Sequence, residues 1–203
     1  MNTTKIRDFL KMDFNYKQSL LFYIAFFSLF LFPIINNDIP YRDDQVRILR
    51  GNDWAFMGRN MADLVMHILT FSYDTVANIS PLTFILSIVA ISCTLTNFLQ
   101  KSLLKSDFIN HLSLSLIFIS PFYLQNLSYQ YDNLTMTLGV CSVITAFAIQ
   151  WNKYQSMIAS ILLLTIGAFF FQPVSNIFVL LVIFNMLAGI KNEDDKLKEV
   201  FKG

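Results

Sequence analysis

Long apolar runs separated by short polar segments dominate the chain. Six of these runs approach the length of about 20 apolar residues that an α-helix needs to cross about 30 Å of hydrocarbon. The predicted spans are residues 18–35, 79–99, 108–124, 134–151, 157–171 and 174–190. The last two can also be interpreted as one long tilted helix, but Gln172 and Pro173 interrupt the run. The pattern therefore predicts an all-α fold, a polytopic bundle of about six transmembrane helices in one membrane domain, residues 1–203.

The positions of lysine and arginine predict how this bundle is oriented. With the N-terminus on the inner side of the membrane, every lysine falls in an inner segment, including the charged tail 191–203. The long outer segment 36–78 instead holds four arginines, namely Arg42, Arg47, Arg50 and Arg59. Inner loops carry the excess of positive charge in membrane proteins. The sequence therefore predicts a multi-pass protein with both termini in the cytoplasm.

Composition excludes several other classes of protein. Hydrophobic residues make up 55% of the 203 residues, charged residues only 14%, and the net charge is +1. Soluble domains carry about 25% charged residues, so a soluble enzyme is nearly excluded. A nucleic-acid partner is not expected either, because the chain has no dense basic face. Cys93 and Cys141 both lie in apolar runs and are expected to be inert thiols.

The outer segment 36–78 predicts two short amphipathic helices. Asp38 is a candidate cap for the first helix, which would stop at Arg50–Gly51. Asp53 is a candidate cap for the second, whose apolar residues recur on one side from Met57 onwards.

Acidic and basic residues share one face of the first of these helices. Asp43 and Arg47 are four residues apart, while Asp44 points about a quarter-turn away. A solvated, salt-bridged face is the simplest interpretation. A transferase that uses a lipid-phosphate sugar, however, needs a carboxylate to take a proton from the acceptor hydroxyl and fixed arginines to hold the phosphate. This segment supplies both. Transporters and channels also carry charges at their mouths, but the predicted spans contain almost no ionisable groups.

Other outer residues add candidate contacts for a sugar. The second outer turn is rich in tyrosine and amides and carries Asp132 with no cation beside it in the sequence. Gln172 lies in the third outer turn, and Trp54 follows the acidic helix. An interfacial aromatic belt and a simple helix hairpin explain the same residues equally well. Asp43 and Asp44 could ligate a divalent metal, but the sequence does not support one, because adjacent carboxylates on a helix diverge. No other cofactor is expected.

Three segments resemble the serotype-converting O-antigen glucosyltransferases, the Gtr membrane enzymes often carried by phages. They are YRDDQVRILRGNDWAFMGRN at 41–60, NLSYQYDN at 126–133 and FQP at 171–173. The first is the most specific, and the resemblance runs from the first span to the sixth. It implies an integral protein of the bacterial inner membrane that is similar to the C superfamily of glycosyltransferases. Such enzymes move glucose from undecaprenyl-phosphate glucose to lipid-linked O-antigen on the periplasmic face.

The resemblance also implies roles for residues of this chain. Asp43 or Asp44 would be the general base, and the candidates for the donor phosphate are Arg42, Arg47 and Arg59. The sugar pocket would be lined by Trp54, Tyr129, Asp132 and Gln172. Family members are usually much longer than this chain. A noncatalytic truncated member, an assembly partner of a second membrane chain, and a transporter or flippase component therefore stay open as alternatives.

Overall fold

The computed structural model describes most of the chain. The described residues are 13–37, 39–41, 43–50, 54–72, 75–102, 104–149, 153–183 and 186. Arg42, the two candidate helix caps Asp38 and Asp53, and the tail 191–203 lie outside them.

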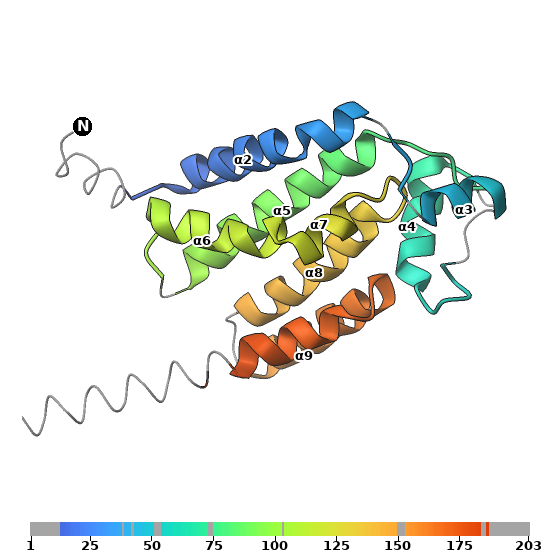
Figure 1. The fold of residues 1–203 in the computed structure, drawn as a ribbon. Helices are drawn as coiled ribbons and strands as arrows, with labels where there is room; N and C mark the ends of the chain where they lie inside the picture. The colour runs from blue at the N-terminus through green and yellow to red at the C-terminus, as the bar shows by residue number, and fades with distance from the viewer. Residues whose placement is uncertain are drawn as a thin grey trace, which may run out of the picture.

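The described residues form helices and no strands (Figure 1). In chain order the helices are α2 (Tyr16–Asn37), α3 (Asp43–Arg50), α4 (Asn60–Thr70), α5 (Leu82–Lys101), α6 (Phe108–Ile119), α7 (Pro121–Leu127), α8 (Asn133–Ala148) and α9 (Lys153–Phe170). A further apolar helix, Val174–Ile183, follows α9. The all-α prediction is therefore confirmed for this part of the chain. The helical run is interrupted at 171–173, the point at which Gln172 and Pro173 predict a break.

The number of helices that are long and apolar enough to cross a membrane is smaller than the predicted six. Within the described residues α2 and α5 meet this criterion, and α6 and α7 meet it together as a pair bent by 65°. The helices Asn133–Ala148, Tyr154–Phe170 and Val174–Ile183 are apolar but shorter. The fold is therefore that of an all-helical protein with two or three candidate spans.

The predicted third span, 108–124, is not one straight helix. Ser120 has an extended backbone, with φ −61° and ψ 144°, and its hydroxyl accepts a hydrogen bond from the backbone N–H of Tyr123. Pro121 takes the first position of α7, where its missing N–H costs nothing. Capping by Ser120 and the ring of Pro121 thus start a new helix, and the apolar run continues in a new direction.

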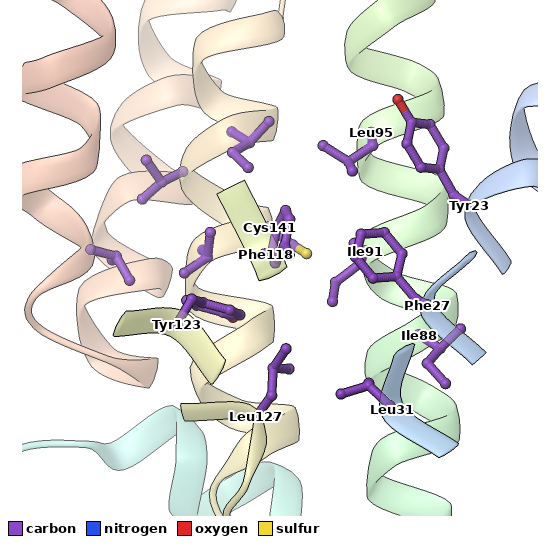
Figure 2. Packing of buried hydrophobic residues seen from close by; sticks show 14 residues of the cluster. Tyr23, Phe27, Leu31, Ile88, Ile91, Leu95, Phe118, Tyr123, Leu127 and Cys141 are labelled. Atoms are coloured by element: carbon purple, nitrogen blue, oxygen red, sulfur yellow. The ribbon is translucent and has the colours of Figure 1, made fainter. Parts of the chain in front are cut away.

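The core of the bundle lies between α2, α5 and α8. The helix α5 packs on α2 and on α8, and α9 packs on α8 (Figure 1). Figure 2 shows side chains from these elements and from α6 and α7 meeting in one cluster, including Phe27, Ile91, Phe118 and Cys141. Cys93 and Cys141 are both free thiols. In lipid such a core is held by close van der Waals packing, because apolar tails compete with apolar side chains.

Two glycines bring α8 and α9 into close contact. A Cβ atom added at Gly167 would lie 3.2 Å from the carbonyl oxygen of Gly139. Small residues let membrane helices approach backbone to backbone, and this contact fixes α9 against α8.

Several loops gather at one end of the bundle, which we call the loop end. It comprises α3, α4, the turn 128–132 before α8 and the turn 171–173 after α9. Figure 1 shows α3 and α4 at this end, with α4 running crosswise to α5 and α9. The loop end brings together segments that are far apart in the sequence.

The second loop helix is shorter than predicted. It begins at Asn60, because residues 54–58 form turns and Gly58 has a φ of +75°. Glycine adopts such a φ without the steric penalty of other residues. Met57 therefore lies before the helix. The first loop helix ends at Arg50 as predicted.

Candidate active site

Asp132 is the centre of the loop end. Its buried carboxylate accepts hydrogen bonds from Arg47 Nε at 2.9 Å and lies 2.7 Å from Arg47 Nη2, both to Oδ2. Arg59 Nη1 lies 3.1 Å from Oδ1, and the indole N–H of Trp54 donates to the same oxygen. One carboxylate thus holds α3, the turn 54–58 and the start of α4 together. We call Asp132, Arg47, Arg59 and Trp54 the arginine cluster.

This pairing corrects the sequence analysis, which placed no cation beside Asp132. The two arginines occupy both of its oxygens, and the predicted contact of Asp132 with a sugar stays a prediction. Arg47 and Asp132 are 85 residues apart in the sequence, which is why a local pattern could not show the pair. Two guanidinium groups and one carboxylate leave the arginine cluster with an excess of positive charge.

The two arginines of the cluster are held differently. The Arg47 guanidinium lies 4.5 Å from the centre of the Trp54 ring, a distance typical of a cation–π contact. Arg59 donates from Nε to the carbonyl of Phe170 at 2.9 Å and from Nη2 to Thr135 Oγ1 at 3.2 Å. Burial lowers the pKa of Arg59, and the charge of Asp132 opposes this shift. Arg59 therefore joins α4 to α8 and α9.

Asp44 is buried and has a structural set of partners. Its Oδ2 accepts from the backbone N–H groups of Tyr41 at 3.0 Å and Gln130 at 2.9 Å. Its Oδ1 accepts from the N–H of Tyr131 at 3.2 Å. Burial raises the pKa of Asp44, while these three hydrogen bonds lower it by less. Asp44 thus anchors the turn 128–132 to the start of α3.

This arrangement predicts that Asp44→Asn lowers the free energy of unfolding by about 1–3 kcal/mol, because buried N–H groups lose an acceptor. The amide offers one oxygen where the carboxylate offers two. Thermal unfolding in detergent micelles, followed by helical circular dichroism, measures the loss. Asp43→Asn is the matched control and should leave the unfolding midpoint unchanged. Equal midpoints for Asp44→Asn and the wild type would contradict the anchoring role.

The same carboxyl predicts a pH dependence of stability. Because the pKa of Asp44 is raised by burial, the folded protein binds this proton more tightly than the unfolded chain does. The stabilisation that comes from binding this proton, which adds to that of the three hydrogen bonds, is therefore lost as the pH rises from the unfolded pKa of Asp44 through its folded pKa. We expect the stability difference between wild type and Asp44→Asn to narrow over this window, as measured by unfolding at a series of pH values.

Asp43 differs from its neighbour in being exposed on α3. Burial raises the pKa of the Tyr129 phenol, a hydrogen bond with the Gln125 side chain opposes this shift, and the negative charge of Asp43 adds to it. The rings of Tyr41 and Tyr129 meet edge to face, with their centres 5.2 Å apart. Of the two adjacent carboxylates, Asp43 is thus the exposed one and Asp44 the buried one.

Gln172 joins the turn 171–173 to the edge of the arginine cluster. Its amide nitrogen donates to the carbonyl of Met57 at 2.9 Å. The same nitrogen lies 3.0 Å from the position of a Cβ added at Gly58, so any larger residue there would have to displace it. The structure therefore brings Trp54, Asp132 and Gln172 to one region, with Tyr129 on the Asp43 side.

The sequence analysis missed a buried polar network beneath this site. Asn133 accepts from Ser87 Oγ at 2.9 Å and donates to Thr83 Oγ1 at 3.2 Å, and Thr83 donates to the carbonyl of Gln130 at 2.9 Å. Thr83 and Ser87 are four residues apart at the start of the predicted second span. Two hydroxyls on one face of an apolar helix are the signal that could have indicated this network.

Comparison with known proteins adds an identity to this geometry. Residues 31–203 match the family described as Glucosyl transferase GtrII. The chain belongs to the GtrII glucosyl transferase family. The matched region includes Asp43 and the whole arginine cluster, and the resemblance to the Gtr enzymes is thereby confirmed.

A phage protein gives a second comparison. The chain is 31% identical over 157 residues to an uncharacterized 55.3 kDa protein in the gtrB 5′ region of Salmonella phage P22. The match covers 75% of this chain and 32% of that protein, so the chain spans about a third of the length of this relative. No solved structure matches the chain.

Proposed function

We propose that this GtrII family chain is a membrane glucosyltransferase. It transfers a glucosyl group from undecaprenyl-phosphate glucose to lipid-linked O-antigen on the periplasmic face of the bacterial inner membrane. The observation that carries this proposal is the arrangement of the loop end, where the positively charged arginine cluster lies near the exposed carboxylate of Asp43. Membership of the family and the phage relative support the reaction class.

The proposed reaction assigns one task to each part of the site. The Asp43 carboxylate takes the proton of the acceptor hydroxyl as its oxygen forms a bond to the anomeric carbon of glucose. The bond between this carbon and the phosphate oxygen breaks, and its electron pair stays on the lipid phosphate. Arg47 and Arg59, whose side chains are almost fully buried against Asp132, stabilise the charge on that phosphate through their electric field, because preorganised charges need no reorganisation. Tyr41, which is partly exposed and packs edge to face on the buried ring of Tyr129, offers an aromatic surface for a sugar ring.

We further propose an orientation and a topology for the chain in the membrane. Lys17, Lys101 and Lys105 lie near the ends of α2, α5 and α6 that are remote from the loop end. Since inner loops carry the positive charge, these lysines favour a cytoplasmic position for that end and for both termini. The shorter helices α8, α9 and Val174–Ile183 would join α2, α5 and the bent pair α6–α7 as spans. The count then reaches six, and a fold of the C superfamily is proposed.

Transfer in vesicles tests the donor and the absence of a metal requirement. We expect vesicles that contain the chain and lipid-linked O-antigen to incorporate labelled glucose from undecaprenyl-phosphate glucose and not from a nucleotide sugar. Incorporation should be unchanged by a chelator, because arginines supply the cations in the proposed mechanism. Transfer from the nucleotide sugar, or loss of transfer on chelation, would contradict these two parts of the proposal.

A further inference from the structure

The helix α4 exposes an apolar flank. Leu64 and Ile68, one turn apart, are 50% and 60% exposed. Phe71, directly after the helix, and Phe56, in the turn before it, are each 95% exposed. Single exposed apolar residues are normal on a protein surface, but a patch of large ones marks an interaction site.

The other sides of α4 are of a different character. Ala62 and Met66 are buried against α8 and α9, where they join Trp54 and Phe170 in a second apolar cluster. Asp63 and His67 occupy the remaining flank, with Oδ1 and Nε2 3.4 Å apart. Around its axis α4 therefore presents a buried side, a polar flank and an exposed apolar flank.

The conformation of Phe71 adds a second observation. Its φ of 52° and ψ of 32° are those of the left-handed region, which is unfavourable for a bulky residue. Helices usually place glycine or asparagine in this conformation. Here the backbone of Phe71 caps α4 by donating to the carbonyls of His67 and Ile68, and the ring projects away from the protein. Contact with water does not stabilise an exposed aromatic ring at such a position, whereas contact with an apolar environment does.

The direction of α4 indicates which environment surrounds its exposed apolar flank. Figure 1 shows α4 running crosswise to the long apolar helices, so that it lies along the membrane plane when α2 and α5 cross the membrane. The helix α9, on which α4 packs, also exposes apolar residues, among them Phe169 near the loop end. Both helices therefore expose large apolar side chains at this end of the bundle.

We propose that α4 is an interfacial helix whose apolar flank lies among the acyl chains of the leaflet at the loop end. Leu64, Ile68, Phe56 and Phe71 enter the hydrocarbon boundary, while the polar flank with Asp63 faces the headgroups and water. Arg59 is the N-cap of α4, so the depth of this helix sets the depth of the arginine cluster. The cluster then lies at the level of the phosphates of the bilayer.

Nitroxide labels on single cysteines test this placement. Cys93→Ala and Cys141→Ala remove the native thiols, and labels are then attached through Leu64→Cys and Ile68→Cys, with Asp63→Cys as the control on the polar flank. Each protein is reconstituted in vesicles of phosphatidylethanolamine and phosphatidylglycerol. Oxygen, which concentrates in hydrocarbon, and a water-soluble nickel chelate serve as relaxing agents. Circular dichroism checks that each labelled protein is folded.

We expect oxygen to relax the labels at 64 and 68 several-fold more than the nickel chelate does, and the reverse at 63. Stronger relaxation by the nickel chelate at 64 and 68 would overturn the proposal. Protection of these two labels from both agents would also overturn it, because a protein surface would then cover the flank. The readout requires no glucosyl transfer, so its failure is distinguishable from failure of the proposed function.

Discussion

Asp43→Asn should reduce the rate of glucosyl transfer by about 10²–10⁴-fold, the usual contribution of a positioned general base. Asp43 is the exposed carboxylate at the start of α3, and its side chain lies near Tyr129. The amide keeps the shape of the side chain but cannot take the proton of the acceptor hydroxyl. The rate of glucose incorporation in vesicles, normalised to the amount of membrane-inserted protein, measures the effect.

The matched control for this prediction is Asp63→Asn. This change also converts an acid of the outer segment to its amide, on the polar flank of α4, where the Asp63 carboxylate lies against His67. It should retain the wild-type rate. If Asp43→Asn transfers glucose at more than a tenth of the wild-type rate, another group takes the proton and the proposed role of Asp43 is wrong.

Asp132→Asn should lower the free energy of unfolding by about 3–5 kcal/mol, because the loss of one partner leaves buried charges without compensation. Arg47 and Arg59 both lie against the Asp132 carboxylate, and the side chains of all three are nearly inaccessible. No other acidic side chain makes a salt bridge to either arginine within the described part of the chain. Unfolding in detergent micelles with increasing denaturant measures the loss.

A double-mutant cycle with Arg47→Gln tests whether this loss comes from the ion pair. In the Asp132→Asn protein, Arg47→Gln removes one of the two buried charges that have lost their partner. The loss of unfolding free energy in the double variant should therefore be smaller than the sum of the losses in the two single variants. Additive losses, or an Asp132→Asn protein as stable as the wild type, would show that the pair does not form.

Local pattern was sufficient to predict the helices of this chain and the break at Gln172 and Pro173. Apolar runs, proline positions and the charges of the outer segment are all properties of neighbouring residues. The bend between α6 and α7 was not predicted. The apolar run continues through Pro121, so that its pattern resembles that of one straight helix. The late start of α4 was not predicted, because Asp53 is a candidate cap in the sequence, whereas residues 54–58 form turns and Gly58 has a positive φ.

The internal arrangement of the site depends on contacts that no local pattern contains. Asp43 and Asp44 are adjacent and chemically identical, and the sequence could not separate their roles. They differ because the turn 128–132 folds over one of them and places its N–H groups on Asp44. The same turn places the Asp132 carboxylate beside the guanidinium groups of Arg47 and Arg59. The tertiary fold therefore makes one carboxylate buried and hydrogen-bonded and leaves the other exposed.

The mass of the O-antigen repeat tests the central claim most directly. A bacterial host that makes undecaprenyl-phosphate glucose and the unmodified O-antigen is compared with and without this chain, and with its Asp43→Asn variant, by mass spectrometry of the lipopolysaccharide. We predict a gain of one hexose per repeat with the wild-type chain and no gain with the variant. An unchanged repeat mass, with the wild-type chain present in the membrane, would contradict glucosyl transfer by this chain.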